Sequence, residues 1–197
     1  TEFTVGYSNV AFLPGFLGSR LYTTEEVNPD CSSEGGEVKL WEPVEIGFDI
    51  PCLSLNDDGT SQKHGIYTRD IVNATFFTWP PNASTYKSLI KFMNELVENG
   101  TINTWKPLPY DWRFSPQDIV SNGVQLPNGE ISNLIEELRQ LAETSDSGQV
   151  TIITHSNGGL LAKYILKKLQ EDGDPLMQEG KIDALIMVAA PQLGTPK

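Results

Sequence analysis

Positive charge and long apolar runs are both scarce in this sequence of 197 residues. The 14 Lys and Arg residues are outnumbered by 26 Asp and Glu residues, which leaves a net charge of −12. Such an acidic chain repels the phosphate backbone of nucleic acids and the anionic face of a bilayer, so we expect no nucleic-acid partner. The longest apolar run, Ala184 to Ala190, is well short of the roughly 18 residues that a membrane-spanning helix needs. The chain is therefore not expected to cross a membrane, and this run predicts a buried strand.

Cysteine is rare as well. Cys31 and Cys52 enclose a stretch rich in Gly, Glu and Pro that has no helical or strand periodicity. A disulfide between them would restrain an otherwise flexible loop and favour a secreted, extracytoplasmic or lumenal location, but two unrelated free thiols fit the sequence equally well. The first residues lack the basic and apolar regions of a signal peptide, so the N-terminus says nothing about secretion. No metal and no cofactor is predicted, and the oligomeric state is left open.

Regular structure is predicted by apolar spacing outside this stretch. Between Ser19 and about Ile66, turn signals follow one another without a period, which indicates a lid or binding loop at about 23–64. Elsewhere strands and helices alternate, and strands that are apolar on both faces favour a mostly parallel sheet with helices on both sides, in a single domain. The predicted strands are 9–13, 105–110, 149–154 and 182–190, and the predicted helices are 86–96, 131–141 and one that begins near Gly158.

The segment 154–159, Thr-His-Ser-Asn-Gly-Gly, lies between an apolar strand and an amphipathic helix. Ser156 occupies the turn itself, where a strained backbone would raise its hydroxyl above the carboxyl edge of the sheet. Gly158 meets the requirement for a small residue two positions later, while Thr154 stands where Gly is commonest. The N–H of Asn157, at the start of the helix, is a candidate donor to an oxyanion. An ordinary strand-to-helix turn is the alternative interpretation.

A second oxyanion donor is expected from the loop after an earlier strand. The segment 13–19, Leu-Pro-Gly-Phe-Leu-Gly-Ser, has glycines that allow close approach of its backbone to a ligand. The N–H of Phe16 or of Leu17 is the candidate donor. Taken alone, the segment is equally compatible with a plain Pro-Gly turn.

Together these segments resemble the lecithin:cholesterol acyltransferase family of the α/β-hydrolase superfamily, which includes lysosomal phospholipases and phospholipid:diacylglycerol acyltransferases. The resemblance is dense in four segments, of which Pro-Tyr-Asp-Trp-Arg is the most specific. The four segments are 12–19, 109–113, 154–159 and 190–196.

The resemblance implies a role for several residues. It implies Ser156 as nucleophile, with backbone donors at Phe16 and Asn157, and a lid that a Cys31–Cys52 disulfide closes, with Trp41 inside it. For Trp41, ordinary packing on the domain is an equal alternative. We also expect Asp111 and Arg113 to form an ion pair, and Leu17 and Trp112 to border the acyl pocket.

The acid and the base of the triad follow the serine in the α/β-hydrolase order. The chain has two histidines, and neither is a good general base, because His64 lies far upstream and His155 points away from the serine hydroxyl. We therefore expect residues 1–197 to be part of one domain that ends before its catalytic Asp and His, with an open sheet edge and little activity alone.

The leading hypothesis is a serine acyl hydrolase or O-acyltransferase that acts on lipid esters through an acyl-Ser156 intermediate, with peripheral contact to a membrane or lipoprotein. Hydrolysis and transfer differ only in the acceptor, and these motifs do not separate them. The alternatives are a lipid- or protein-binding module that kept the fold without the triad, and another α/β-hydrolase such as a peptidase or carbohydrate esterase.

Overall fold

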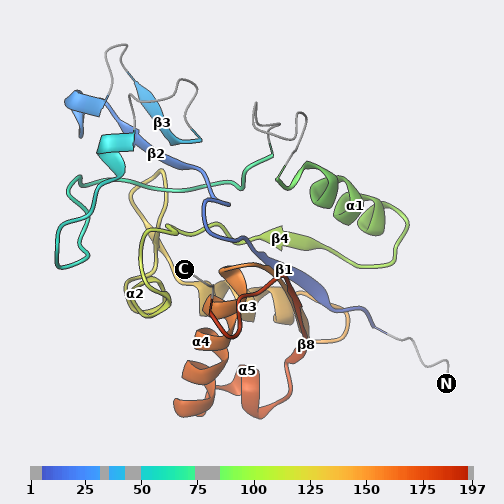
Figure 1. The fold of residues 1–197 in the computed structure, drawn as a ribbon. Coiled ribbons are helices and arrows are strands. Elements are labelled where there is room, and N and C mark those ends of the chain that lie inside the picture. The colour runs from blue at the N-terminus through green and yellow to red at the C-terminus, as the bar shows by residue number, and fades with distance from the viewer. Residues whose placement is uncertain (1–5, 32–35, 43–49, 74–84, 195–197) are drawn as a thin grey trace, which may run out of the picture.

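A computed structural model describes residues 6–31, 36–42, 50–73 and 85–194. Its centre is a four-stranded parallel sheet in the order β4-β1-β7-β8, of which Figure 1 labels β4, β1 and β8. The strands are β1 (Asn9–Leu13), β4 (Trp105–Pro107), β7 (Val150–His155) and β8 (Ile182–Val188). The predicted mostly parallel α/β sheet is therefore confirmed.

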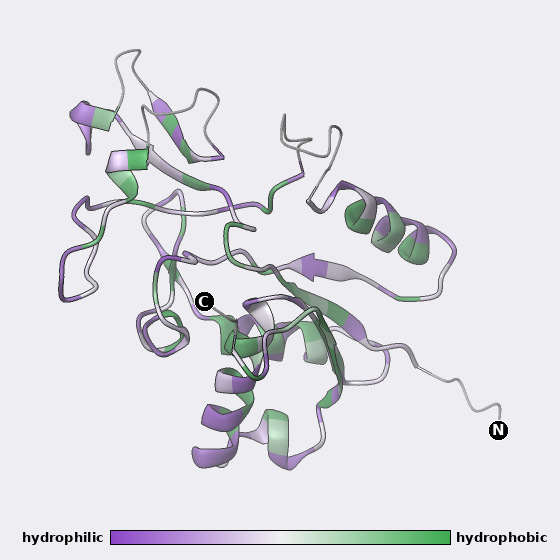
Figure 2. Ribbon diagram, in the orientation of Figure 1, coloured by the Kyte–Doolittle hydropathy of each residue, from purple (hydrophilic) through white to green (hydrophobic). Residues whose placement is uncertain are grey.

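Helices cover both faces of this sheet. Successive side chains of β1 point to opposite faces, so they pack against different helices. Ala11 and Leu13 join the larger core cluster, to which α3 (Leu134–Glu143) and α4 (Gly158–Glu171) contribute. Phe12 joins a second cluster with residues of α1 (Lys87–Glu98). Figure 2 shows β1 in mostly hydrophobic colours, whereas hydrophobic and hydrophilic residues alternate along α1 and α4. The amphipathic helices thus bury one face each against the sheet.

Two predicted boundaries were wrong by three residues each. The helix predicted from Ile131 begins at Leu134, because Asn133 caps it by accepting hydrogen bonds from the N–H groups of Ile135 and Glu136. Ile131 belongs instead to the short strand β6 (Ile131–Ser132), paired with β5 (Val124–Gln125), and is 57% exposed. The strand predicted to run to residue 110 ends at Pro107.

The strand β8 was predicted to be buried, but its residues are half-buried or exposed. Within the described residues it pairs with β7 alone, so it forms an edge of the sheet. Ile186 is 48% and Val188 is 51% exposed. An apolar run predicts a strand, but whether that strand is buried depends on the neighbouring strands and helices, which the run does not specify. The expected open edge is observed here.

The stretch predicted to be irregular contains a small second sheet. The strands β2 (Leu21–Thr24) and β3 (Glu37–Trp41) pair antiparallel, and the short 3₁₀ turns η1 (Pro29–Cys31) and η2 (Ile50–Leu53) lie beside them. Residues 32–35 and 43–49 of the predicted lid-like loop lie outside the described residues. We refer to the described residues 21–31, 36–42 and 50–72 as the disulfide lobe.

Cys31 and Cys52 are joined by a disulfide in this lobe, with Cα atoms 6.0 Å apart. The predicted pairing is confirmed, and both cysteines are buried. The structure also describes two short helices, α2 (Pro116–Asn122) and α5 (Pro175–Gln178). Among the helices that the structure describes, none has both the length and the hydrophobicity to span a membrane.

Candidate active site

Ser156 lies directly after β7, with a positive φ of 49°. This is a left-handed conformation that non-glycine residues seldom adopt, and such strain concentrates at functional sites. The Ser156 N–H donates to the carbonyl oxygen of Val188, 2.9 Å away, so the turn is anchored to the end of β8. The turn has the backbone expected of a nucleophile held between a strand and a helix.

Gly158 allows the helix α4 to start almost in contact with the loop that follows β1. A Cβ atom on Gly158 would lie 2.4 Å from the carbonyl oxygen of Leu13 and 2.5 Å from that of Pro14. These are backbone atoms, so a side chain at Gly158 would force the two segments apart. The glycine two positions after Ser156 is therefore required by the packing of two backbones.

The loop 13–19 lies against Ser156. A Cβ atom on Gly15 would lie 3.0 Å from the Ser156 Cβ. The loop makes a tight turn in which the Gly18 N–H donates to the Gly15 carbonyl oxygen at 2.9 Å, and Leu17 has a positive φ of 61°. Within the described residues, the N–H groups of Phe16, Leu17 and Asn157 donate no hydrogen bond. Three backbone N–H groups, of which one follows Ser156 in the chain and two follow Gly15, are thus without an acceptor among the described residues.

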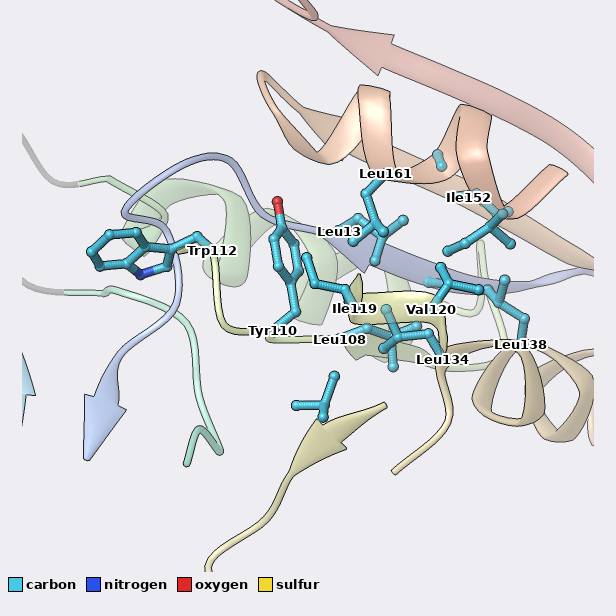
Figure 3. Packing of buried hydrophobic residues seen from close by; sticks show 14 of the residues in the cluster. Leu13, Leu108, Tyr110, Trp112, Ile119, Val120, Leu134, Leu138, Ile152 and Leu161 are labelled. Carbon is cyan, nitrogen blue, oxygen red and sulfur yellow. The ribbon is translucent and has the colours of Figure 1, made fainter. Parts of the chain in front are cut away.

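Three hydrogen bonds join the Pro-Tyr-Asp-Trp-Arg segment to this loop. The Tyr110 N–H donates to Ser19 Oγ at 3.0 Å, and the Tyr110 hydroxyl donates to the Pro14 carbonyl oxygen at 2.7 Å. The Trp112 Nε1–H donates to the Ser19 carbonyl oxygen at 2.9 Å. Figure 3 shows the Tyr110 and Trp112 rings at one end of the core, with Leu13 beside Tyr110.

A family model described as "Lecithin:cholesterol acyltransferase" matches residues 62–197, which is more than half of the chain. The chain belongs to the lecithin:cholesterol acyltransferase family. Membership places it with α/β-hydrolase-type lipid acyltransferases and hydrolases, whose substrates are lipid esters. A comparison with curated proteins found no match.

In this family member the predicted ion pair is present. Arg113 Nη2 lies 2.5 Å from Asp111 Oδ2, and the Arg113 side chain is only 4% exposed. The Arg113 guanidinium also donates to the Leu53 carbonyl oxygen and to Ser61 Oγ. The pair therefore connects the segment 109–113 to the disulfide lobe.

Three aromatic rings form a continuous contact next to the loop. The Trp112 ring contacts the Phe16 ring with centroids 5.0 Å apart and the Trp41 ring with centroids 5.6 Å apart, both edge to face. Trp112 is buried, whereas Phe16 is 59% exposed. Trp41 is half-buried, and its Nε1–H donates to the Leu17 carbonyl oxygen at 2.8 Å. The described contacts of Trp41 are those of a packed side chain that stabilises Leu17, while its role in a lid stays a prediction.

Neither histidine hydrogen-bonds to the Ser156 hydroxyl within the described residues. His64 lines a cavity of about 360 Å³ together with Arg113 and Asp118, and Ser156 is not among the residues that line it. The His155 Nδ1 lies 2.9 Å from the Tyr86 hydroxyl oxygen, and burial lowers the pKa of His155. This favours the neutral imidazole.

Tyr86 lies beside the Ser156 turn, although no sequence motif marks it as a site residue. It was recognised only as the first apolar position of a helix, and its ring is buried beside Phe12. Burial raises the pKa of the Tyr86 hydroxyl, and the hydrogen bond from Gly15 lowers it by a smaller amount. No motif includes this hydroxyl, so only the folded chain reveals its neighbours.

Proposed function

We propose that Ser156 is the nucleophile of a lipid ester hydrolase or O-acyltransferase. The observation that carries the proposal is the strained Ser156 turn with the Gly15 backbone packed directly against it. In the first step the Ser156 Oγ bonds to the ester carbonyl carbon, its proton passes to a general base, and the lipid alcohol leaves with a proton. In the second step the oxygen of water or of a second alcohol bonds to the acyl carbon, the bond from that carbon to Ser156 Oγ breaks, and the base passes the acceptor's proton to Oγ.

The N–H groups of Phe16 and Asn157 are proposed to stabilise the oxyanion that develops on the carbonyl oxygen. Their support is that both lack a hydrogen-bond acceptor among the described residues, although the loop and the helix start around them are tightly packed. A preorganised donor of this kind contributes about 10²–10³-fold to the rate. Leu17 is the neighbouring alternative donor, and its N–H is also without an acceptor in that part of the chain.

The general base is proposed to come from outside these 197 residues. The α/β-hydrolase order places the acid and the histidine after the serine, and no histidine follows Ser156 in the sequence. His155 Nδ1 lies 2.9 Å from the Tyr86 hydroxyl oxygen, and no hydrogen bond among the described residues joins the His155 ring to Ser156, so we propose that His155 supports the turn.

The proposal is tested with the full-length natural protein and vesicles of phosphatidylcholine. Fatty acid release and ester formation are measured with and without an added long-chain alcohol. Ser156→Ala is expected to lower both products at least about 10³-fold, because a serine nucleophile acts as one unit with its base. Ser121→Ala, on an exposed part of α2, is the control and should leave the rates unchanged.

The same assay separates the alternatives. Activity on short soluble esters but not on phospholipid would favour a different esterase of the same fold. Lipid binding without turnover, unchanged by Ser156→Ala, would favour a binding module and contradict the proposal. The ratio of fatty acid to new ester distinguishes hydrolysis from transfer.

A further inference from the structure

Two buried tyrosine hydroxyls hold opposite ends of one peptide group in the active-site loop. The peptide group that joins Pro14 and Gly15 has a carbonyl oxygen that accepts from the Tyr110 hydroxyl at 2.7 Å. Its N–H donates to the Tyr86 hydroxyl oxygen at 2.8 Å. Tyr110 is 0% and Tyr86 is 4% exposed, so water does not replace either bond easily. The orientation of this peptide plane is therefore fixed from both sides.

The fixed peptide lies one residue before Phe16, whose N–H is the proposed oxyanion donor. A rotation of the Pro14–Gly15 peptide would change the direction of the next N–H, since neighbouring peptide planes share the Gly15 Cα atom. Gly15 has no side chain to resist such a rotation. The two hydroxyls supply the restraint that the glycine itself lacks.

Tyr86 also contacts the nucleophile turn. Its hydroxyl lies 2.9 Å from His155 Nδ1, and the two rings meet edge to face with centroids 5.6 Å apart. Because the hydroxyl oxygen accepts from Gly15, its one proton is available to a neutral His155 Nδ1. A Cβ atom on Gly18 would lie 2.7 Å from the hydroxyl oxygen, so that glycine makes room for it. One oxygen atom thus connects the loop to the residue beside Ser156.

We infer that Tyr86 is a positioning residue that sets the geometry of the oxyanion hole relative to Ser156. The inference rests on the proposed function of Ser156. Tyr86 acts through Gly15 and His155 and has no direct contact with the reacting atoms. A misplacement of about 1 Å at such a site lowers the rate about 10²-fold.

The test uses the full-length natural protein and the soluble ester p-nitrophenyl butyrate. Sites are counted by the end point of labelling with a fluorophosphonate, so that kcat refers only to folded, reactive molecules. Tyr86→Phe is expected to lower kcat about 10- to 100-fold with KM within about threefold of the wild-type value, because the defect concerns the oxyanion and not substrate binding. The matched control is Tyr67→Phe, which removes a buried tyrosine's hydrogen bond to Glu37 in the disulfide lobe and should change neither constant by more than about twofold.

A double-mutant cycle with Tyr110→Phe provides a second measurement. If both hydroxyls hold the same peptide, the loss of either releases it, and the double variant should lose much less than the product of the two single losses. Losses in kcat that simply multiply, or a Tyr86→Phe variant with wild-type kcat, would overturn the inference. An unlabelled wild type, or Ser156→Ala with full activity, would instead refute the proposed function.

Discussion

The edge of the sheet around Ser156 and the disulfide lobe are stabilised by different kinds of interaction. Around Ser156, in residues 13–19 and 154–159, the described contacts are buried hydrogen bonds from uncharged groups, close glycine packing and left-handed residues. The disulfide lobe has a covalent bond between Cys31 and Cys52 and ion pairs such as Arg69 with Glu37. Short uncharged contacts define atomic positions, whereas a disulfide limits unfolding without defining a site, and exposed ion pairs add little to stability. Changes in the first region should therefore affect the chemistry, whereas changes in the second should affect the stability alone.

The largest expected effect is that of Gly158→Ala, which tests the close packing around Ser156. The new Cβ would overlap two backbone carbonyl oxygens, at 2.4 and 2.5 Å. Overpacking against backbone is costly, so we expect a loss of about 4 kcal/mol in the free energy of unfolding and at least about 10²-fold in kcat. Urea unfolding and ester hydrolysis measure the two quantities.

Gly173→Ala is the control for Gly158→Ala. Gly173 has a positive φ of 65° but open space around its Cα, so alanine there adds backbone strain without a clash. A loss of about 1 kcal/mol in the free energy of unfolding with unchanged kcat is expected. Equal effects of the two substitutions on kcat would show that the contact at Gly158 is unimportant.

Arg113→Gln should cause the next largest loss of unfolding free energy. Arg113 connects the two regions. The substitution leaves Asp111 half of a broken buried pair, which costs about 3–4 kcal/mol of unfolding free energy. Arg69→Gln removes an exposed ion pair, with the Arg69 side chain 44% exposed, and should cost less than about 1 kcal/mol. Urea midpoints of the two variants provide the comparison, and similar values would mean that burial does not decide the strength of these pairs.

Removal of the disulfide tests whether the disulfide lobe contributes to stability and not to catalysis. The double variant Cys31→Ser with Cys52→Ser opens a loop with a sequence separation of 21, so about 3 kcal/mol of unfolding free energy should be lost. Below the lowered Tm, kcat on a soluble ester should stay within about twofold of the wild-type value. A large fall in kcat of the folded variant would show that the disulfide lobe helps to shape the site.

The smallest expected effect is a pH dependence of stability that arises at His155. Burial lowers its pKa in the folded state, so the unfolded state binds a proton first as the pH falls below its ordinary value of about 6.5. Stability is full above that pH and should decrease as the pH falls toward the folded pKa. His155→Gln should remove this part of the slope in urea midpoints measured at several pH values, and an unchanged slope would assign it to other groups.

The sequence predicted those elements whose stabilising partners are near in the chain. The strand 9–13, the helix with apolar residues from Tyr86 to Leu96 and the Ser156 turn follow from local periodicity and turn chemistry. The pairing of β2 with β3 was not predicted, and neither was the bridge between Tyr22 and Tyr67, because each joins segments that turns separate in the chain.

Tyr86 was not predicted as a site residue because its partners are also distant in the chain. Apolar spacing identified Tyr86 by its ring alone, since a hydroxyl does not change helical periodicity. Its partners Gly15 and His155 are 71 and 69 residues away in the chain. Residues that act by touching two distant loops leave no local pattern, whereas Ser156 is recognisable because its turn imposes one.

The central claim, that Ser156 is the nucleophile of a preorganised site, is tested most directly by covalent trapping. The full-length natural protein is treated with a fluorophosphonate, digested and analysed by mass spectrometry. The account predicts one modified serine, Ser156, and no modification after unfolding in urea, because the reactivity depends on the folded turn. A modified serine elsewhere in a protein that hydrolyses esters, or labelling of Ser156 that persists in urea, would contradict it.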